Sequence, residues 1–257
     1  MSAPGVMRNI KLLIAYDGTG FGGWQRQKNA VTIQGEIEDR LALMTAGPVT
    51  LLGAGRTDAG VHARGMVANF HTEATIPCEG FLKGLNSLLP GNIRILSVED
   101  AAADFHARFS AQAKTYIYTI YTGPVLLPAE RFSVCHTPFA LEFDLIDQCL
   151  AMVTGTRDFA CFELSGSRDT SRPGGRGSIR TILSADLHDQ GNSHFHFSIT
   201  GDGFLRQMVR IMVGTILEVG KGRRSREDFQ QTLTSRDRRR AGPPAPAHGL
   251  TLHEIFY

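Results

Sequence analysis

The sequence of 257 residues has little of what marks several common protein classes. Its four cysteines, Cys78, Cys135, Cys149 and Cys161, show no CxxC spacing, so we expect reduced, mostly buried thiols and no disulfide framework. No apolar run approaches the ~18 residues that span a bilayer, and residues 1–8 lack the apolar stretch of a signal peptide. These absences favour a soluble, cytoplasmic protein without a membrane partner.

Motifs for nucleotide-dependent and acyl-transfer chemistry are also missing. The chain has no GxxxxGK and no GxSxG pattern. Gly53 and Gly55 follow a strand pattern, but Asp58 stands where a dinucleotide-binding turn needs its third glycine, and a carboxylate there would repel a pyrophosphate. His62 and His194 lack further ligands at metal-binding spacing. We therefore expect neither an organic cofactor nor a metal.

What the chain does have is an apolar fraction of 42%, enough for a sizeable core, and an excess of arginine over lysine. The formal net charge is only +2, but residues 157–240 carry 15 basic and 10 acidic side chains. Arginine suits bidentate phosphate contacts. A GC-rich coding bias explains the excess equally well, so composition alone leaves a nucleic-acid partner open.

Hydrophobic periodicity over the first hundred residues predicts the order β-α-β-β-α-β. Thr32 is placed to cap the first helix, and Pro90 to stop the second. The expected segments are a strand at 9–16, a helix at 33–44, a strand ending at 52, a strand at 66–70, a helix at 81–89 and a strand at 93–98. This is the order of a ferredoxin-like half.

The remainder of the chain predicts a repeat of that order. The expected segments are strands at 115–121, 181–187, 194–200 and 250–256, helices at 141–152 and 204–219, and a shorter helix from 225. We therefore expect an α+β fold in which two ferredoxin-like halves, residues 1–105 and 106–257, form one extended antiparallel sheet with helices packed on one face. The Gly-, Ser- and Arg-rich residues 165–178 predict a mobile loop.

The chain is organised around residues 53–70, where a glycine-rich loop joins two strand patterns. Asp58 lies at its centre, with Arg56 two residues before it and Arg64 six residues after. Glycines let the backbone bend and approach other groups closely. A lone carboxylate in such a loop is either a turn former or a catalyst.

The helix expected at 204–219 is apolar around most of its circumference, yet it contains Arg206 and Arg210 four residues apart, in line with Gly214. A buried arginine needs a partner because an unpaired internal charge is costly. Physical chemistry alone favours a structural salt bridge for Arg210 over a functional role. Asp58 is its candidate partner.

Two further features have a structural and a functional interpretation. Tyr116, Tyr118 and Tyr121 lie on one strand, where core packing is favoured over a stacking platform for an unstacked base. The arginine-rich residues 236–240 are expected to be a solvated face, with contact to an RNA backbone as the alternative.

These stretches together resemble the TruA-type tRNA pseudouridine synthases over almost the whole chain. The most specific string is Gly-Arg-Thr-Asp-Ala-Gly-Val-His at residues 55–62. The other stretches that carry the resemblance are residues 16–19, 23–25, 104–111, 114–118, 180–182, 203–205, 208–210 and 245–250. Pro244 departs from the family pattern, in which a threonine is expected.

The resemblance implies a role for each matched residue. Asp58 matches the essential aspartate, and Tyr116 the tyrosine that packs against the target base. Arg210 matches the basic residue paired with the aspartate, and Arg56 the arginine that holds the place of the flipped nucleotide. The family acts on uridines at positions 38–40 of the tRNA anticodon stem-loop, as a homodimer, without metal or cofactor. Tyr118 keeps its interpretation as a core residue.

Several alternatives remain open at this point. A non-catalytic tRNA-binding or chaperone module on the same fold would not need Asp58, and a nucleoside hydrolase-like enzyme would release free uracil. In the synthase, the carboxylate has three candidate roles: attack at C1′, addition at C6 of uracil, or abstraction of the 2′ proton.

Overall fold

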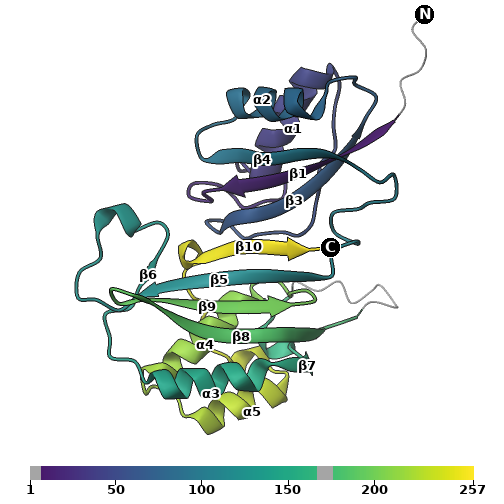
Figure 1. The fold of residues 1–257 in the computed structure, drawn as a ribbon. Coiled ribbons are helices and arrows are strands. Elements are labelled where there is room, and N and C mark those ends of the chain that lie inside the picture. Colours follow the sequence, from purple (N-terminus) through teal and green to yellow (C-terminus); the bar gives the residue numbers. More distant parts are fainter. Residues whose placement is uncertain (1–6, 167–175) are drawn as a thin grey trace, which may run out of the picture. The chain divides into compact units, whose positions relative to one another are not determined.

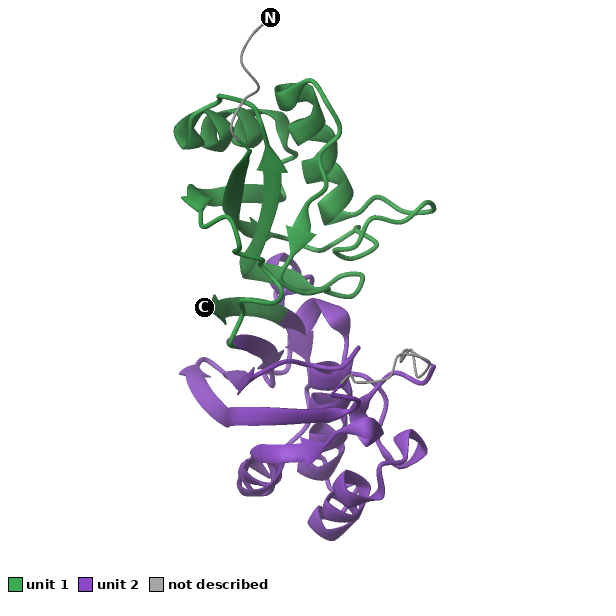
Figure 2. Cartoon of the chain, turned by 90° about the vertical axis from the view of Figure 1, so that its right-hand side faces the viewer, with its two compact units in different colours: residues 1–112, 251–257 green, residues 113–250 purple. Residues whose placement is uncertain are grey.

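The computed structural model describes residues 7–166 and 176–257. The chain divides into two compact units, Met1–Gln112 with Thr251–Tyr257, and Ala113–Leu250 (Figure 2). The final strand therefore belongs to the first unit, whereas the sequence grouped it with the second half. Both units are mixed α+β, as predicted, and no helix within the described ranges is long and apolar enough to cross a membrane.

The first unit has the predicted element order. It contains β1 (Arg8–Tyr16), α1 (Ile33–Thr45), β2 (Leu52–Gly53), β3 (His62–Thr72), α2 (Cys78–Leu88) and β4 (Ile93–Ala101). β1 lies between β4 and β3, β2 pairs with β3, and all three pairings are antiparallel. The last strand, β10 (Leu250–Phe256), lies beside β3 in parallel, which departs from the expected antiparallel sheet. Figure 1 shows α1 and α2 on the same face of these strands.

Local sequence explains the helices of the first unit. The Thr32 hydroxyl accepts a hydrogen bond from Gly35 N–H, the expected cap, and Ile33, Ile37 and Leu41 are all buried. In α2, Phe81 is buried and its ring meets Phe70 edge to face at 5.5 Å. The predicted amphipathic pattern therefore holds for both helices.

The second unit has more elements than a simple repeat of the first. It contains β5 (Ala113–Tyr121), β6 (Cys135–His136), α3 (Phe143–Val153), β7 (Gly155–Asp158), β8 (Ile179–Gly191), β9 (His194–Gly201), α4 (Met208–Gly220) and α5 (Arg226–Ser235). The strand order is β5-β9-β8-β7, with β6 parallel to β5. The two short strands β6 and β7 were not predicted.

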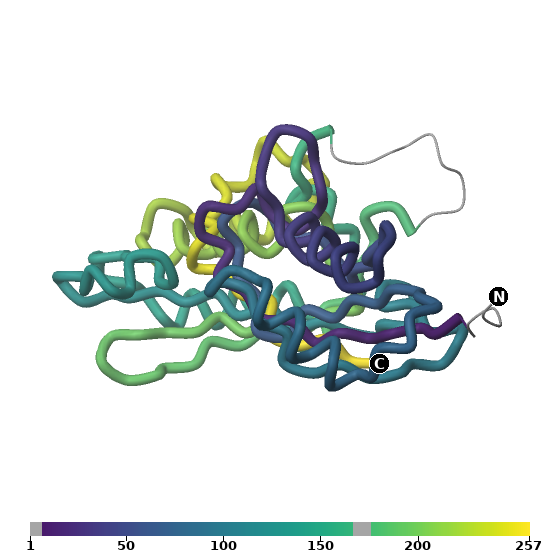
Figure 3. The backbone as a smooth tube through the Cα atoms, turned by 90° about the horizontal axis from the view of Figure 1, so that it is seen from above, coloured from purple at the N-terminus to yellow at the C-terminus, as the bar shows by residue number. Residues whose placement is uncertain are grey.

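The segment between β5 and β6 lies at the turn end of the β8–β9 hairpin, as Figure 3 shows. The Thr122 N–H donates to Ser193 O at 2.9 Å, and Ser193 is one of two turn residues with positive φ. Three helices, α3, α4 and α5, pack against one another, and α3 also packs on β8.

The prediction for the helix that contains Arg210 was wrong at its start. The helix begins at Met208 instead of residue 204, because Gln207 has a left-handed backbone with φ of 60°. Arg206 is exposed and lies before the helix, so it does not share a helical face with Arg210. The Arg206 carbonyl instead accepts a hydrogen bond from Leu164 N–H at 3.0 Å.

Two other predictions for side chains in the core are confirmed. Tyr118 is fully buried, its hydroxyl donates to Pro246 O at 2.9 Å, and burial raises its pKa well above the ordinary value. All four cysteines are free thiols; Cys135, Cys149 and Cys161 are buried and Cys78 is half-buried. Part of the loop predicted at residues 165–178 lies outside the described residues.

Candidate functional site

The loop that carries Asp58 lies in the first unit, between β2 and β3, and packs directly against the other glycine-rich stretch of that unit. A Cβ added to Gly23 would lie 2.6 Å from Thr57 O, and one added to Gly53 would lie 2.5 Å from Trp24 Nε1. The Trp24 N–H donates to Thr57 O at 3.1 Å, and Trp24 is almost fully buried. The two loops therefore meet backbone to backbone at Gly23, whereas Gly53 lies against the Trp24 side chain, and a larger residue would clash at either place.

Asp58 begins a tight turn whose neighbouring residue is anchored in the core. The Val61 N–H donates to Asp58 O at 3.2 Å, and Gly60 has a φ of 78°. Thr57 is buried, and its hydroxyl is 2.8 Å from the hydroxyl of Tyr16 on β1. The backbone on both sides of the half-buried Asp58 is thus held in place.

His62, the first residue of β3, holds the loop that follows β1. The Gly18 N–H donates to His62 Nδ1 at 3.1 Å, and Asp17 Oδ1 also lies 3.1 Å from this nitrogen. One nitrogen cannot accept from Gly18 and donate to Asp17 at the same time, so the two contacts are alternatives that depend on whether Nδ1 carries the proton. Burial would raise the pKa of Asp17, but hydrogen bonds from Thr19 and the neighbouring His62 outweigh it and lower the pKa.

Arg56 is exposed, and a chain of amide side chains ties its guanidinium to α1. Arg56 Nε donates to Gln25 Oε1 at 3.1 Å, and Gln25 Nε2 donates to Gln34 Oε1 at 2.8 Å. Gln34 Nε2 then donates to Glu38 Oε1 at 2.9 Å, and this carboxylate also accepts from Leu51 N–H at 2.9 Å. Residues 23–25, which include Gln25, carry part of the family resemblance, but no contact with Arg56 was predicted for Gln25. Gln34 and Glu38 were not predicted to lie here; both are polar residues of α1 that the structure buries.

In the second unit, Tyr116 lies on β5 opposite Ile199 of β9. The residue is 8% exposed, and its ring meets the ring of Phe204 edge to face, with centroids 5.1 Å apart and an interplanar angle of 87°. Phe204 therefore supports one side of the tyrosine and sets its orientation.

Arg210 lies in the first turn of α4 and is half-buried. Its Nε donates to Ala245 O at 2.9 Å, and Ala245 N–H donates back to Arg210 O at 2.9 Å. A Cβ added to Gly214, one turn later, would lie 2.1 Å from Pro243 O. The segment that contains the unexpected Pro244 therefore runs against this side of α4 and anchors the guanidinium at one nitrogen.

The structure thus places Asp58 and Arg56 in the first unit, and Tyr116 and Arg210 in the second. The pairing of Asp58 with Arg210 stays a prediction. Arg56, Tyr116 and Arg210 each make a side-chain contact inside their own unit, with Gln25, Phe204 and Ala245 respectively.

The arginine-rich residues 236–240 are largely neutralised by carboxylates. Arg236 lies 3.3 Å from Asp158, Arg239 lies 2.8 Å from Asp237, and Arg240 lies 3.3 Å from Asp228. Arg238 donates to a backbone carbonyl. These contacts favour the solvated-face interpretation of this run.

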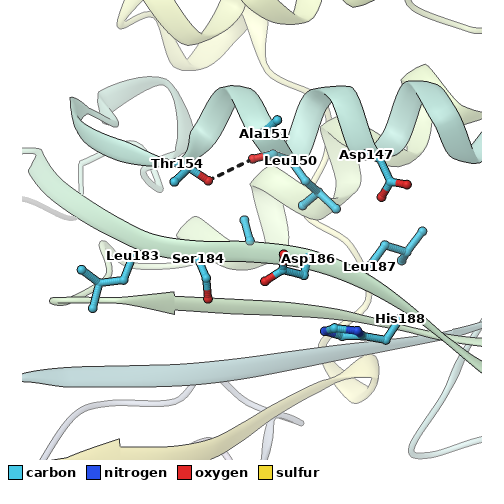
Figure 4. A pocket seen from close by; sticks show the side chains of 10 residues that line it. Asp147, Leu150, Ala151, Thr154, Leu183, Ser184, Asp186, Leu187 and His188 are labelled. Carbon is cyan, nitrogen blue, oxygen red and sulfur yellow. Dashed lines mark hydrogen bonds between the residues drawn. The ribbon is translucent and has the colours of Figure 1, made fainter.

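A groove between α3 and β8 contains none of the four predicted site residues (Figure 4). Thr154, at its edge, donates to Leu150 O at 3.5 Å within the helix end. The lining residues are Asp147, Leu150, Ala151, Thr154, Leu183, Ser184, Ala185, Asp186, Leu187 and His188.

The family model described as tRNA pseudouridine synthase matches residues 12–110 and 150–257, most of the chain. The chain therefore belongs to the tRNA pseudouridine synthase family, whose members are isomerases.

Curated relatives narrow this assignment. The chain is 52% identical to tRNA pseudouridine synthase A 1 of Desulfotalea psychrophila, over 98% of this chain and all of the relative. It is 43% identical, with the same coverage, to tRNA pseudouridine synthase A of Acetivibrio thermocellus and to that of Clostridium kluyveri. Within the family the chain falls with the tRNA pseudouridine synthases A, the TruA branch, and the resemblance seen in the sequence is confirmed.

Proposed function

We propose that the chain converts uridine to pseudouridine at positions 38–40 of the tRNA anticodon stem-loop, with Asp58 as the catalytic carboxylate. The observation that carries the proposal is the fixed turn of Asp58, held by the Tyr16–Thr57 hydrogen bond and by the close packing at Gly23. Catalysis needs a reacting group held in one place, and these contacts hold the turn that carries Asp58.

The reaction suits a chain with a single central carboxylate. The N1–C1′ bond of uridine breaks, the uracil turns while it is retained, a C5–C1′ bond forms, and the C5 hydrogen leaves as a proton while N1 gains one. Positive charge develops at C1′ as the bond loosens, and an ionised carboxylate stabilises or captures it. A glycosidase also needs a second carboxyl group to activate water, whereas this isomerisation uses no water and so needs no second carboxyl group for that purpose.

The other residues have roles before the chemical step. A stacked uridine must be extruded at a cost of a few kcal/mol, and stacking on an aromatic ring such as Tyr116 returns about 1–3 kcal/mol. Arg56 would occupy the space that the extruded nucleotide leaves. Arg210 would keep Asp58 ionised and oriented, since a neighbouring cation favours the charged carboxylate.

Replacing Asp58 tests the proposal. Asp58→Asn keeps the shape of the side chain and should abolish tritium release from tRNA labelled at uridine C5, while tRNA affinity stays within a few-fold of the parent. Asp147→Asn, which removes a carboxylate from the exposed face of α3, is the matched control and should retain full activity. Full activity of Asp58→Asn would exclude the catalytic role and favour a non-catalytic tRNA-binding module. Free uracil in the products would indicate a hydrolase.

We also infer that the protein acts as a homodimer, as the family resemblance implies. Light scattering after size-exclusion chromatography should give twice the chain mass of 28.1 kDa. A mass equal to one chain at micromolar concentration would contradict this inference.

A further inference from the structure

Two basic residues at the end of α4, Lys221 and Arg223, differ from their neighbour Arg224 and from three of the arginines at residues 236–240, which are paired with carboxylates. Among the residues that the structure describes, neither Lys221 nor the Arg223 side chain forms a hydrogen bond or an ion pair with a carboxylate, whereas Arg224 between α4 and α5 binds Asp228 at 2.7 Å. Lys221 is half-buried and Arg223 is exposed.

Both cations instead lie against one aromatic ring from another segment. Lys221 Nζ is 5.0 Å and Arg223 Cζ is 5.6 Å from the centroid of Phe139, a residue that precedes α3 and is 49% exposed. The two segments are tied together by the Glu142 N–H, which donates to Gly220 O at 2.8 Å. The cluster is therefore built by the tertiary fold, unlike the contact of Arg131 with its sequence neighbour Phe132.

A cation that lies against an aromatic ring can still bind an anion, whereas a cation paired with a carboxylate is already neutralised. A ring orients the charged group through its quadrupole but does not neutralise it. Two like charges on one ring also repel each other. Burial lowers the pKa of Lys221, and the neighbouring Arg223 lowers it further. Glu218 acts in the opposite direction, but it lies 3.5 Å from Arg224 and is shared with it.

A helix C-terminus favours nearby cations by about 0.3–1 kcal/mol, and this could account for a single basic residue after α4. It does not account for two cations on one exposed ring. An anion placed between them would relieve their repulsion.

The surface beside the ring does not oppose an anion. A hollow next to Phe139 has no charged residue in its lining. It is lined by Thr122, Pro124, Pro138, Phe139, Ala140, Leu141 and Phe143.

We propose that Lys221, Arg223 and Phe139 form a phosphodiester-binding subsite for the backbone of the tRNA substrate. This proposal rests on the proposed function, because it takes tRNA as the ligand. Lys221 follows Arg210 by eleven residues, about 16 Å along a helix at 1.5 Å per residue. The subsite therefore contacts a stretch of backbone away from the reacting nucleotide, and it contributes affinity without reading sequence.

Salt-dependent binding tests the subsite. The double variant Lys221→Ala, Arg223→Ala and the parent protein are titrated with an unmodified tRNA transcript by filter binding at several KCl concentrations. The variant should bind about tenfold more weakly, and the slope of log Kd against log[KCl] should fall by about 1. Its kcat for tritium release at saturating tRNA should equal that of the parent.

Further variants separate recognition from stability. Phe139→Leu should lose part of the affinity, and Phe139→Tyr should restore it, because tyrosine also holds cations on its face. Arg239→Ala is the control, since this exposed arginine is already paired with Asp237, and it should leave the slope unchanged. Single Lys221→Gln and Arg223→Gln variants replace the double variant if it fails to fold, and each should lower the slope by less than the pair.

The outcomes distinguish this proposal from the one on which it rests. An unchanged slope in folded variants that still release tritium overturns the subsite alone. A lower melting temperature with an unchanged slope would show that the cations only stabilise the end of α4, and it also overturns the subsite. Absence of tritium release from the parent protein overturns the proposed function instead.

Discussion

The two units hold their candidate residues by different means. In the first unit, hydrogen bonds and backbone contacts fix the Asp58 loop, and a chain of amide and carboxylate groups reaches Arg56. In the second unit, apolar packing dominates: α4 is buried along most of its length, and Tyr116 rests on Phe204. Loss of a polar partner should therefore be most damaging around the Asp58 loop of the first unit, and added bulk on α4 should be most damaging in the second.

The largest expected effect comes from crowding α4. Gly214→Ala places a Cβ 2.1 Å from Pro243 O, a backbone atom that cannot rotate away. Because overpacking a tight interface typically costs 1–3 kcal/mol and sometimes more, we expect a loss of about 3 kcal/mol in the free energy of unfolding. Urea denaturation followed by circular dichroism measures it.

Gly47→Ala is the matched control for this variant. Gly47 has no atom within 4 Å of an added Cβ and no positive φ. Its free energy of unfolding should change by less than about 1 kcal/mol, and the change is expected to be favourable. Equal losses in the two variants would refute the packing explanation.

The second effect is loss of a buried carboxylate in the first unit. Glu38→Ala leaves Leu51 N–H, Gln34 and Arg26 without their shared acceptor, so we expect a loss of about 2–3 kcal/mol. Glu79→Ala removes an exposed pair with Lys83 and should cost less than about 0.5 kcal/mol. Thermal melts of both variants against the parent decide the point, and a melting temperature for Glu38→Ala near that of Glu79→Ala would contradict it.

A smaller effect on stability, with a clearer effect on rate, is expected next to Asp58. Tyr16→Phe and Thr57→Val each remove one side of a single hydrogen bond, which contributes about 1 kcal/mol. If this bond positions Asp58, kcat should fall about tenfold, which corresponds to ~1.4 kcal/mol in the barrier. In the double-mutant cycle the effects should not add, because either change breaks the same contact. Fully additive losses would show that the two residues act independently and would contradict a shared role for this hydrogen bond.

The smallest effect is expected at the arginine-rich residues 236–240. Hydrogen bonds from Arg239 hold the pKa of Asp237 at about 2, below its unfolded value. The contribution of Asp237 to the free energy of unfolding is therefore present above about pH 4 and lost as the pH falls toward 2. Because the pair is exposed and screened by solvent, Asp237→Asn should barely change acid unfolding. A clear shift of the acid midpoint would show that the run contributes more than a solvated face.

Much of the first unit could be predicted because its signals are local. Amphipathic spacing gave α1 and α2, Thr32 marked a helix start, and the glycines at residues 53–60 marked a loop that must approach another chain segment. Asp58 and Arg56 stood out for the same reason, within a string specific to one family.

The missed features depend on tertiary contacts. Gln34 and Glu38 are polar residues of an amphipathic helix, and a periodicity argument assigns such residues to the surface unless their partners on other segments are known. β6 and β7 have two and four residues, too few to show alternation. Gln207 adopts a left-handed backbone inside an apolar stretch, so nothing in the pattern marked the true start of α4.

The parallel pairing of β10 with β3 bears on how the chain is made. Thr251 lies opposite His62 and Leu252 opposite Ala63, so the last strand pairs with the segment that immediately follows the Asp58 turn. The whole second unit, Ala113–Leu250, is translated between these partners. A nascent chain therefore keeps this edge of β3 without its β10 partner until the last strand has been synthesised, so the first unit is completed last although most of it is synthesised first.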